Sequence, residues 1–315
     1  MAVTAATAHA AGLKLFEIPA DPRGPALKVA EWSPCSKPSG TLKLGPFSLP
    51  GVSDCPLAGN HLPLILISHG FGGTYLSHHD TAEALANAGF IVVALNHPDD
   101  TASNPEKEYN LKALVSRPTD IKRLLDYMLG SSPDAAKIDP RRIGFFGFSR
   151  GGYTGLILAG AIPDFSRLRS HCPDPTGESC QPVNPGALPS SLPSHDARFK
   201  AFVIADPLGN VFPTKESVHA VTAPLELWGS ERGGDGVSPK DLARIAGNLS
   251  PKPDLHIVPN AGHFAFLTVC PAALAERLPD LCQDARGFDR ATFHQEFDTK
   301  VLAFFRDKLT APATP

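Results

Sequence analysis

The residues Ile143-Gly144-Phe145-Phe146-Gly147-Phe148-Ser149-Arg150-Gly151 place a serine between two glycines, directly after an apolar run. This G-x-S-x-G pattern, followed by a Gly-rich run that suits a helix, predicts a sharp strand-to-helix turn with Ser149 at its tip. The glycines fit such a turn because it leaves no room for side chains beside the serine. A hydroxyl at the beginning of a helix suits nucleophilic chemistry, because the helix dipole favours a developing negative charge. The alternative is an ordinary tight turn capped by a serine.

Apolar and helical segments alternate outward from this turn. The runs Leu64 to Ser68 and Phe90 to Leu95 are typical of buried strands, and the segment from Ser77 to Ala88 between them has a helical pattern. This alternation predicts an α/β fold, with a mostly parallel central sheet and helices on both faces. We also expect strands at 199–205, 225–228 and 255–258, helices at 119–129 (after Pro118), 151–161 and 290–309, and antiparallel edge strands before about residue 32.

The 315 residues, 42% of them hydrophobic, are expected to form one α/β domain over 1–315. Three regions rich in proline and glycine, at 33–62, 163–196 and 230–239, are interpreted as loops or insertions on that domain. The insertion 163–196 would form either a lid or a solvated surface loop. Residues 1–12 fit either a disordered terminus or the remnant of an export signal, since Ala8-His9-Ala10 resembles a signal cleavage site.

The charge balance limits the classes of binding partner that the sequence favours. The net charge is −3, from 29 Lys and Arg against 32 Asp and Glu, so no basic excess favours nucleic acid. No apolar run reaches the roughly eighteen residues that a membrane span requires. The expected partner is therefore a small, near-neutral molecule.

Six cysteines fall into three local pairs along the sequence: Cys35 with Cys55, Cys172 with Cys180, and Cys270 with Cys282. Each pair would close an irregular, Pro/Gly-rich segment, which favours disulfides and a periplasmic or secreted location. The alternative is six buried thiols in a cytoplasmic protein. No metal site is predicted, because no C-x-x-C or H-E-x-x-H occurs and the adjacent residues His78, His79 and Asp80 could not all face one ion.

A nucleophilic serine needs a base and an acid. His263 follows the expected strand at 255–258 and comes after both acid candidates in the chain order Ser, Asp, His, so we expect it to be the base. Asp235, in a D-x-V-x-P loop after the 225–228 strand, is the favoured acid. Asp206, at the end of the 199–205 strand, is the alternative, because it could reach the same imidazole.

The oxyanion formed on attack needs two backbone N–H donors. One is expected from Arg150, and the other from Phe71 in the loop His69-Gly70-Phe71-Gly72-Gly73, although this loop could be an ordinary Gly-rich turn. The Arg150 side chain could meet an anionic substrate or make a local salt bridge. Four aromatic residues are candidates for the substrate pocket or, alternatively, for the core: Tyr75, Phe148, Trp228 and Phe264.

Together these motifs resemble the α/β-hydrolase superfamily, and more closely the bacterial dienelactone-hydrolase-like proteins, relatives of the platelet-activating-factor acetylhydrolases. The resemblance runs from about Leu62 to Leu309 and implies carboxylic ester hydrolysis without a metal or cofactor. Dienelactone hydrolase itself is similar but has cysteine where Ser149 stands. The acetylhydrolases take their acid from the position matching Asp206, whereas dienelactone hydrolase and the cutinase-like esterases take it from the loop matching Asp235.

The sequence therefore predicts a serine hydrolase that cleaves carboxylic esters through an acyl-enzyme. A phospholipase A2-like or acetylhydrolase-like enzyme and a polyester hydrolase are alternatives, because the motifs carry little information about the substrate. A binding protein without catalysis is a third, because an intact triad does not by itself prove turnover.

Overall fold

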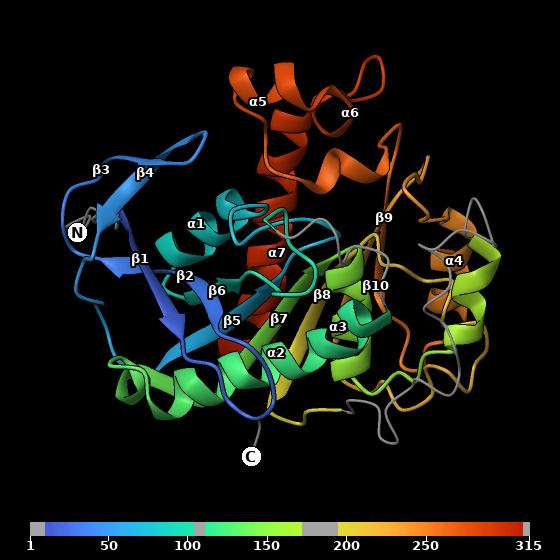
Figure 1. The fold of residues 1–315 in the computed structure, drawn as a ribbon, viewed down its shortest axis with the longest axis horizontal. Helices are drawn as coiled ribbons and strands as arrows, with labels where there is room; N and C mark the ends of the chain where they lie inside the picture. The colour runs from blue at the N-terminus through green and yellow to red at the C-terminus, as the bar shows by residue number, and fades with distance from the viewer. Residues whose placement is uncertain (1–9, 104–110, 172–194, 311–315) are drawn as a thin grey trace, which may run out of the picture.

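A computed structural model describes residues 10–103, 111–171 and 195–310. Ten strands form one sheet in the order β10-β9-β8-β7-β5-β6-β2-β1-β4-β3 (Figure 1). The strands are β1 (Ala10–Ile18), β2 (Leu27–Cys35), β3 (Gly40–Leu44), β4 (Phe47–Ser53), β5 (Leu62–Ser68), β6 (Ile91–Leu95), β7 (Ile138–Phe148), β8 (Phe199–Ala205), β9 (Leu225–Ser230) and β10 (Asp254–Val258). The six strands from β10 to β6 are parallel, and β2 joins them antiparallel to β6.

Helices cover both faces of the sheet, as the sequence predicts. The α-helices are α1 (His79–Asn87), α2 (Leu111–Gly130), α3 (Arg150–Leu158), α4 (Pro239–Asn248), α5 (Ala272–Arg277), α6 (Pro279–Cys282) and α7 (Arg290–Thr310). Helices α2, α3 and α4 pack on one face through a core that includes Leu124, Leu156 and Ile245. Helices α1 and α7 pack on the other through a core that includes Leu85 and Phe297. No helix in the described ranges is long and apolar enough to cross a membrane.

Helix α2 differs from its prediction. The sequence places its beginning after Pro118, but the helix begins at Leu111 and contains this proline. Proline cannot donate a hydrogen bond to the carbonyl four residues earlier, which normally ends a helix. Here the hydroxyl of Tyr153, on α3, donates to the carbonyl of Leu114 at 3.4 Å and replaces the missing donor. Tertiary packing therefore preserves the helix.

The N-terminal part is also more regular than predicted. Ala10 to Gly12, expected in a disordered terminus or signal remnant, form the first residues of β1 and pair with β2. The region 33–62, interpreted as loop, contains the hairpin β3–β4. Residues 172–194 of the insertion 163–196 lie outside the described residues, so the lid hypothesis stays a prediction.

Two of the three expected disulfides are present. Cys35 pairs with Cys55, and Cys270 pairs with Cys282, whereas the third pair lies outside the described residues. The first bridge joins the two ends of the β3–β4 hairpin, and the second closes the segment that contains α5 and α6. Both segments are short, so the bridges constrain chain that has little core of its own. Disulfides of this kind are typical of an oxidising compartment.

Candidate active site

Ser149 occupies a strained turn between β7 and α3. Its φ of 56° and ψ of −115° lie outside the helical and strand regions. The turn is held by the Ser149 N–H, which donates to the carbonyl of Ala205 at 3.0 Å, and by the Ser149 carbonyl, which accepts from the N–H of Tyr153 at 3.0 Å. A non-glycine residue persists in this conformation only where the surrounding structure enforces it, and such residues cluster at functional sites.

The flanking glycines explain why the strand can approach the helix so closely. A Cβ added to Gly147 would lie 2.3 Å from the carbonyl oxygen of Gly151. A Cβ added to Gly151 would lie 1.8 Å from the carbonyl oxygen of Ser68, on β5. Both contacts are backbone contacts, so no flexible side chain can move aside to make room.

We therefore expect Gly151→Ala to lower the free energy of unfolding by about 3 kcal/mol or more, because β5 and α3 must separate. Gly247→Ala is the control: Gly247 is exposed near the end of α4, with nothing within 4 Å of an added Cβ. That variant should be neutral or more stable by up to about 1 kcal/mol. Urea denaturation measures both, and equal stability of the two variants would contradict the close-packing argument.

His263 and Asp206 meet next to Ser149. Nδ1 of His263 lies 2.7 Å from Oδ2 of Asp206, and both side chains are almost fully buried. The Asp206 carboxylate also accepts the N–H of Ser230 at 2.9 Å and its hydroxyl at 2.8 Å. Three donors on one carboxylate fix its orientation. A proton on Nδ1 of His263 then leaves Nε2 as an acceptor.

Packing against a neighbouring aromatic ring also positions the imidazole of His263. The ring of Phe148 stacks on that of His263, with centroids 4.6 Å apart. The backbone N–H of His263 donates to the carbonyl of Gly233 at 2.9 Å. Nε2 is buried and has no hydrogen-bond partner within the described residues. It belongs to a side chain that lines the same pocket as Ser149.

Asp235, the acid favoured on sequence grounds, lies elsewhere in this site. It is exposed in the turn that Gly234 and Val237 close, and it lines the pocket. Among the described contacts of His263, the hydrogen bond at Nδ1 is to Asp206 and none is to Asp235. The turn holds the Asp235 backbone at a positive φ of 48°. The geometry thus favours the alternative acid over the preferred one.

The loop expected to hold the oxyanion is braced by a buried ion-pair network. The guanidinium of Arg150 lies over the ring of Phe71, 4.2 Å from its centroid, and pairs with Asp100 at 3.0 Å. Asp100 also accepts the backbone N–H of Gly72 at 3.1 Å and an N–H of Arg117 at 2.7 Å. The Arg150 side chain therefore makes the local salt bridge considered as one alternative. Its backbone begins α3, next to Ser149.

Arg117 connects this network to the end of β5. It donates to the carbonyl of His69 and to the hydroxyls of Ser68 and Thr154, and it is fully buried. Burial lowers the pKa of Arg117, while Asp100 opposes this effect. Because three oxygens accept from one guanidinium beside a carboxylate, the cation is compensated and holds β5, α3 and the oxyanion loop together.

His69, the first residue of that loop, has a defined tautomer. Its Nε2 accepts the backbone N–H of His97 at 3.1 Å, so the proton lies on Nδ1, which faces the carbonyl of Gly70 at 2.6 Å. Burial lowers the pKa of His69 to about 3, so the ring is neutral. His69 is therefore a structural histidine of the loop.

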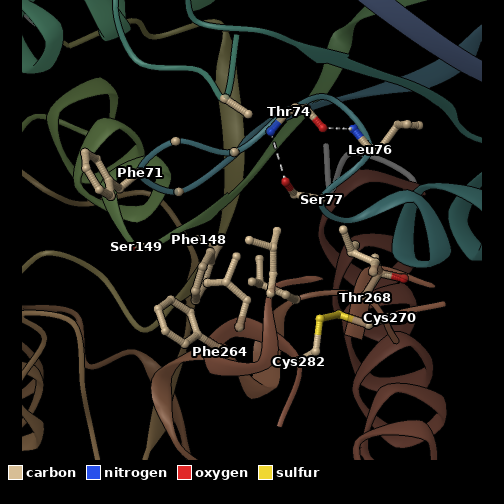
Figure 2. Close-up of a pocket in the computed structure, with 18 of the residues that line it drawn as sticks. Phe71, Thr74, Leu76, Ser77, Phe148, Ser149, Phe264, Thr268, Cys270 and Cys282 are labelled. Atoms are coloured by element: carbon tan, nitrogen blue, oxygen red, sulfur yellow. Dashed lines mark hydrogen bonds between the residues drawn. A yellow bond between two sulfur atoms is a disulfide. The ribbon is translucent and has the colours of Figure 1, made fainter. Parts of the chain in front are cut away.

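A pocket of about 390 Å³ opens at Ser149 and His263 (Figure 2). Phe148 and Phe264 line it, as predicted. Its outer wall is built by the β3–β4 hairpin and the α5–α6 segment, including the disulfide Cys270–Cys282, and both were missed from the sequence. The apolar side chains from these two segments are Pro46, Phe47, Leu274, Leu278 and Leu281.

Tyr75 and Trp228, also predicted for the pocket, are not among its lining residues. Trp228 is buried against Phe297 of α7, with ring centroids 4.9 Å apart, because its position on β9 faces that helix. Tyr75 packs against the same core. For both residues the alternative interpretation, a core aromatic, is the one that the structure supports.

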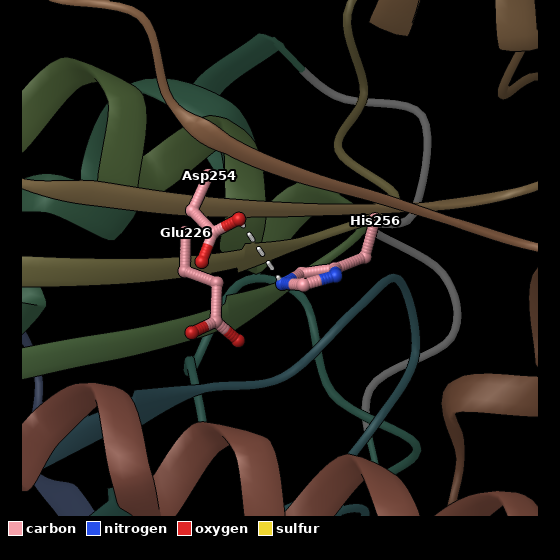
Figure 3. A group of neighbouring side chains, drawn as sticks. All are labelled: Glu226, Asp254 and His256. Carbon is pink, nitrogen blue, oxygen red and sulfur yellow. Dashed lines mark ion pairs between the residues drawn. The ribbon is translucent and has the colours of Figure 1, made fainter.

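Glu226, Asp254 and His256 are the one group of three potential metal ligands that lie close together within the described ranges (Figure 3). His256 Nε2 lies 3.5 Å from Asp254, and Glu226 accepts the indole N–H of Trp228. The group lies near the beginnings of β9 and β10, whereas Ser149 follows the end of β7. Parallel strands place these at opposite edges of the sheet, so we assign the group no part in the candidate site.

Comparisons with known proteins agree with this architecture. A solved ferulic acid esterase from Streptomyces cinnamoneus superposes on the whole chain and on 94% of its own length, with a TM-score of 0.68 and 18% identity. The chain is an α/β-hydrolase by fold. The family model of platelet-activating factor acetylhydrolase, isoform II, matches residues 35–122 of this chain.

Curated relatives include bacterial cutinases. Cutinase est2 of Thermobifida alba is 33% identical over 111 residues, and cutinase 2 of Thermobifida cellulosilytica is 31% identical over 111 residues. Each match covers 35% of this chain and 34% or 38% of the respective cutinase. The chain thus aligns with only about a third of the length of these relatives.

Proposed function

We propose that this α/β-hydrolase is a serine esterase for carboxylic esters. The observation that carries the proposal is the geometry at His263: Nδ1 faces the buried Asp206 carboxylate, while Nε2 has no described partner and lies in the pocket of Ser149. A base with one nitrogen oriented by an acid and the other open toward a serine is the arrangement that activates a hydroxyl. The partial cutinase similarity and the esterase-like fold support the same activity class.

In the proposed reaction, Oγ of Ser149 attacks the ester carbonyl while Nε2 of His263 takes the hydroxyl proton. The backbone N–H groups of Phe71 and Arg150 donate to the oxyanion. His263 then returns the proton to the departing alcohol, and water activated by the same nitrogen attacks the acyl-enzyme and releases the acid. Asp206 keeps Nδ1 protonated and stabilises the imidazolium that forms.

The pocket supports an ester with one apolar acyl or aryl group. Phenylalanine and leucine side chains line the pocket. Some of them come from the β3–β4 hairpin and from the α5–α6 segment. Such walls favour a small molecule over a long polymer chain, which needs an open, shallow cleft. The two disulfides support a periplasmic or secreted location for this esterase.

We expect the α5–α6 segment to select the acyl chain. The double variant Cys270→Ala/Cys282→Ala removes the bridge that closes this segment, so its leucines should contact a long chain less well. Each lost methylene contact costs about 0.8 kcal/mol. If about two such contacts are lost, the ratio of kcat/KM for octanoate esters to kcat/KM for acetate esters should fall by about tenfold. The acetate rate of the same variant is the internal control, because a two-carbon acyl group offers far less apolar surface to this segment than an eight-carbon one. An unchanged ratio would exclude this segment as the acyl wall.

Hydrolysis of p-nitrophenyl esters by the wild type, with labelling of Ser149 by a fluorophosphonate, tests the proposal directly. Turnover together with labelling at Ser149 is expected. If the protein neither turns over any ester nor reacts with the fluorophosphonate, the esterase proposal fails, and a non-catalytic binding protein on this scaffold becomes the better explanation.

A further inference from the structure

The turn that carries His263 is tied to the rest of the molecule by a second histidine. His294, on α7, is buried, and its Nε2 lies 2.9 Å from the carbonyl oxygen of Ala265. Ala265 lies in the single 3-10 turn His263–Phe266, two residues after the proposed base. Nδ1 of His294 lies 2.7 Å from Oδ2 of Asp80, in the first turn of α1. His294 therefore bridges the base turn and α1.

Each ring nitrogen of His294 lies close to one oxygen atom: Nε2 is hydrogen-bonded to the carbonyl of Ala265, and Nδ1 forms an ion pair with the carboxylate of Asp80. A carbonyl oxygen has no proton to give, so Nε2 must carry one. Nδ1 lies 2.7 Å from the Asp80 carboxylate, a separation typical of an ion pair, so we infer that Nδ1 also carries a proton. Burial opposes the ionised form of Asp80, but its interaction with His294 outweighs burial and lowers the pKa of Asp80. His294 with protons on both nitrogens is an imidazolium.

The groups around this pair favour the positive charge. Asp298 lies one turn further along α7 and accepts the hydroxyl of Thr81 at 2.6 Å, and burial raises its pKa to about 7. His78, directly before α1, interacts unfavourably with a charged His294, but burial lowers the pKa of His78 to about 3, so that ring is neutral. The charge of His79 acts on Asp80, and that of Glu83 acts on Asp298. Burial lowers the pKa of His294, but the hydrogen bond and charge of Asp80 outweigh it, so the pKa is raised above 6.5.

A second connection joins the same two regions. The backbone N–H of Thr268 donates to the carbonyl of Ser77 at 3.1 Å, and its hydroxyl lies 3.1 Å from Nε2 of His79. Ser77 and His79 follow directly on the loop that contains Phe71. The base turn is thus fixed against the helix that follows the oxyanion loop, on one side by Thr268 and on the other by His294.

We propose that His294 is a positioning residue: as an imidazolium between Ala265 and Asp80, it sets the placement of His263 relative to the oxyanion loop. This inference rests on the proposed ester hydrolysis. His294 itself is not among the residues that line the pocket, so its effect on His263 is indirect. Misplacing a catalytic group by about 1 Å can cost on the order of a hundredfold in rate, so a bridge this close to the base can affect turnover without touching the substrate.

The bridge implies a defined pH dependence. Because the folded-state pKa of His294 is raised above 6.5, its stabilising contribution is complete below pH 6.5 and is lost as the pH rises through the folded value. Loss of the second proton weakens the contact with Asp80 and loosens the base turn. The turnover number of the wild type should therefore fall on the alkaline side of its pH profile.

The test uses His294→Gln, Asp80→Asn and the double variant. Glutamine can still donate to Ala265 but cannot carry the charge, and asparagine removes the charge from its partner. His219→Gln is the control, because His219 is exposed and its side-chain hydrogen bond within the described ranges is to the nearby carbonyl of Glu216. Fluorophosphonate titration counts the active molecules, and kcat and KM for p-nitrophenyl acetate are measured from pH 5 to 10.

We expect kcat per titrated site to fall by about tenfold to a hundredfold in both single variants, with KM within about twofold of the wild type. The double variant should lose no more than the worse single variant, because both break one bridge. The alkaline fall seen in the wild type should be absent from all three. An unchanged kcat per site and an unchanged pH profile, even with a lower melting temperature, would make His294 merely structural and would overturn the proposal.

A second measurement does not need catalysis. Nitrogen-15 NMR of the histidine rings in Ser149→Ala reports which nitrogens carry protons, and His294 should carry two at pH 7. A neutral His294 ring would overturn this inference while leaving the esterase proposal intact. Failure of the wild type to hydrolyse any ester, with a doubly protonated His294, would instead count against the esterase proposal alone.

Discussion

Replacing Ser149 by alanine is expected to lower kcat/KM for p-nitrophenyl esters by a thousandfold or more. The hydroxyl is the only group of this residue that can form the acyl-enzyme, and loss of a triad nucleophile has effects on this scale. The strained turn should persist in the variant, because its hydrogen bonds to Ala205 and Tyr153 come from the Ser149 backbone. Equal melting temperatures for variant and wild type check this point.

Ser166→Ala is a matched control, because Ser166 is exposed and, among the residues that the structure describes, hydrogen-bonds to the nearby Asp164 alone. It should retain wild-type kcat/KM and also reveals any contaminating esterase in the preparation. If Ser149→Ala and wild type hydrolyse the esters equally, the observed activity does not come from this serine, and the proposed mechanism is wrong.

Asp206→Asn should lower kcat by about 10⁴-fold, while Asp235→Asn should change it by about twofold at most. Two groups of Ser230 and Nδ1 of His263 all donate hydrogen bonds to the Asp206 carboxylate. Asparagine replaces one of the two accepting oxygens with an NH₂ group, which is itself a donor. Either one of these donors then loses its acceptor, or His263 changes its tautomer. Asp235 is exposed and makes no described hydrogen bond with the imidazole. Solvent screens its charge, so its removal changes the field at His263 little.

The comparison of the two asparagine variants needs no external standard, since each serves as the control for the other. Circular dichroism excludes misfolding, and kcat is measured with saturating substrate at one pH. The reverse result, a severe loss in Asp235→Asn with a mild one in Asp206→Asn, would mean that the Asp235 turn closes over His263 during the reaction.

The sequence predicts the central features of this site because they depend on local constraints. A serine between Gly147 and Gly151 after an apolar strand admits few backbone conformations, and the structure has the expected turn. The strand at 199–205 is predicted to the residue, because a buried apolar run between polar ends has clear limits.

The remaining features depend on tertiary contacts that a single sequence does not encode locally. Asp206 and Asp235 both follow strands, and only the packed sheet shows which one reaches Nδ1 of His263. Arg117 offered a usable signal that was missed: it falls on the apolar face of α2 with Leu114 and Ile121, where a cation needs a buried partner such as Asp100. The α5–α6 segment lacked a strong periodic pattern because its helices are short.

The two disulfide bridges have a consequence for how this enzyme scaffold could change its specificity. Each bridge closes one of the two segments that build the outer wall of the pocket, residues 35–55 and 270–282, and neither segment contributes Ser149, His263 or Asp206. A disulfide therefore joins the two ends of each segment, so that each is a short closed loop of the chain. Its interior could be exchanged between related chains, or diversified in a library, while the reaction machinery and the parallel strands β5 to β10 stay unchanged.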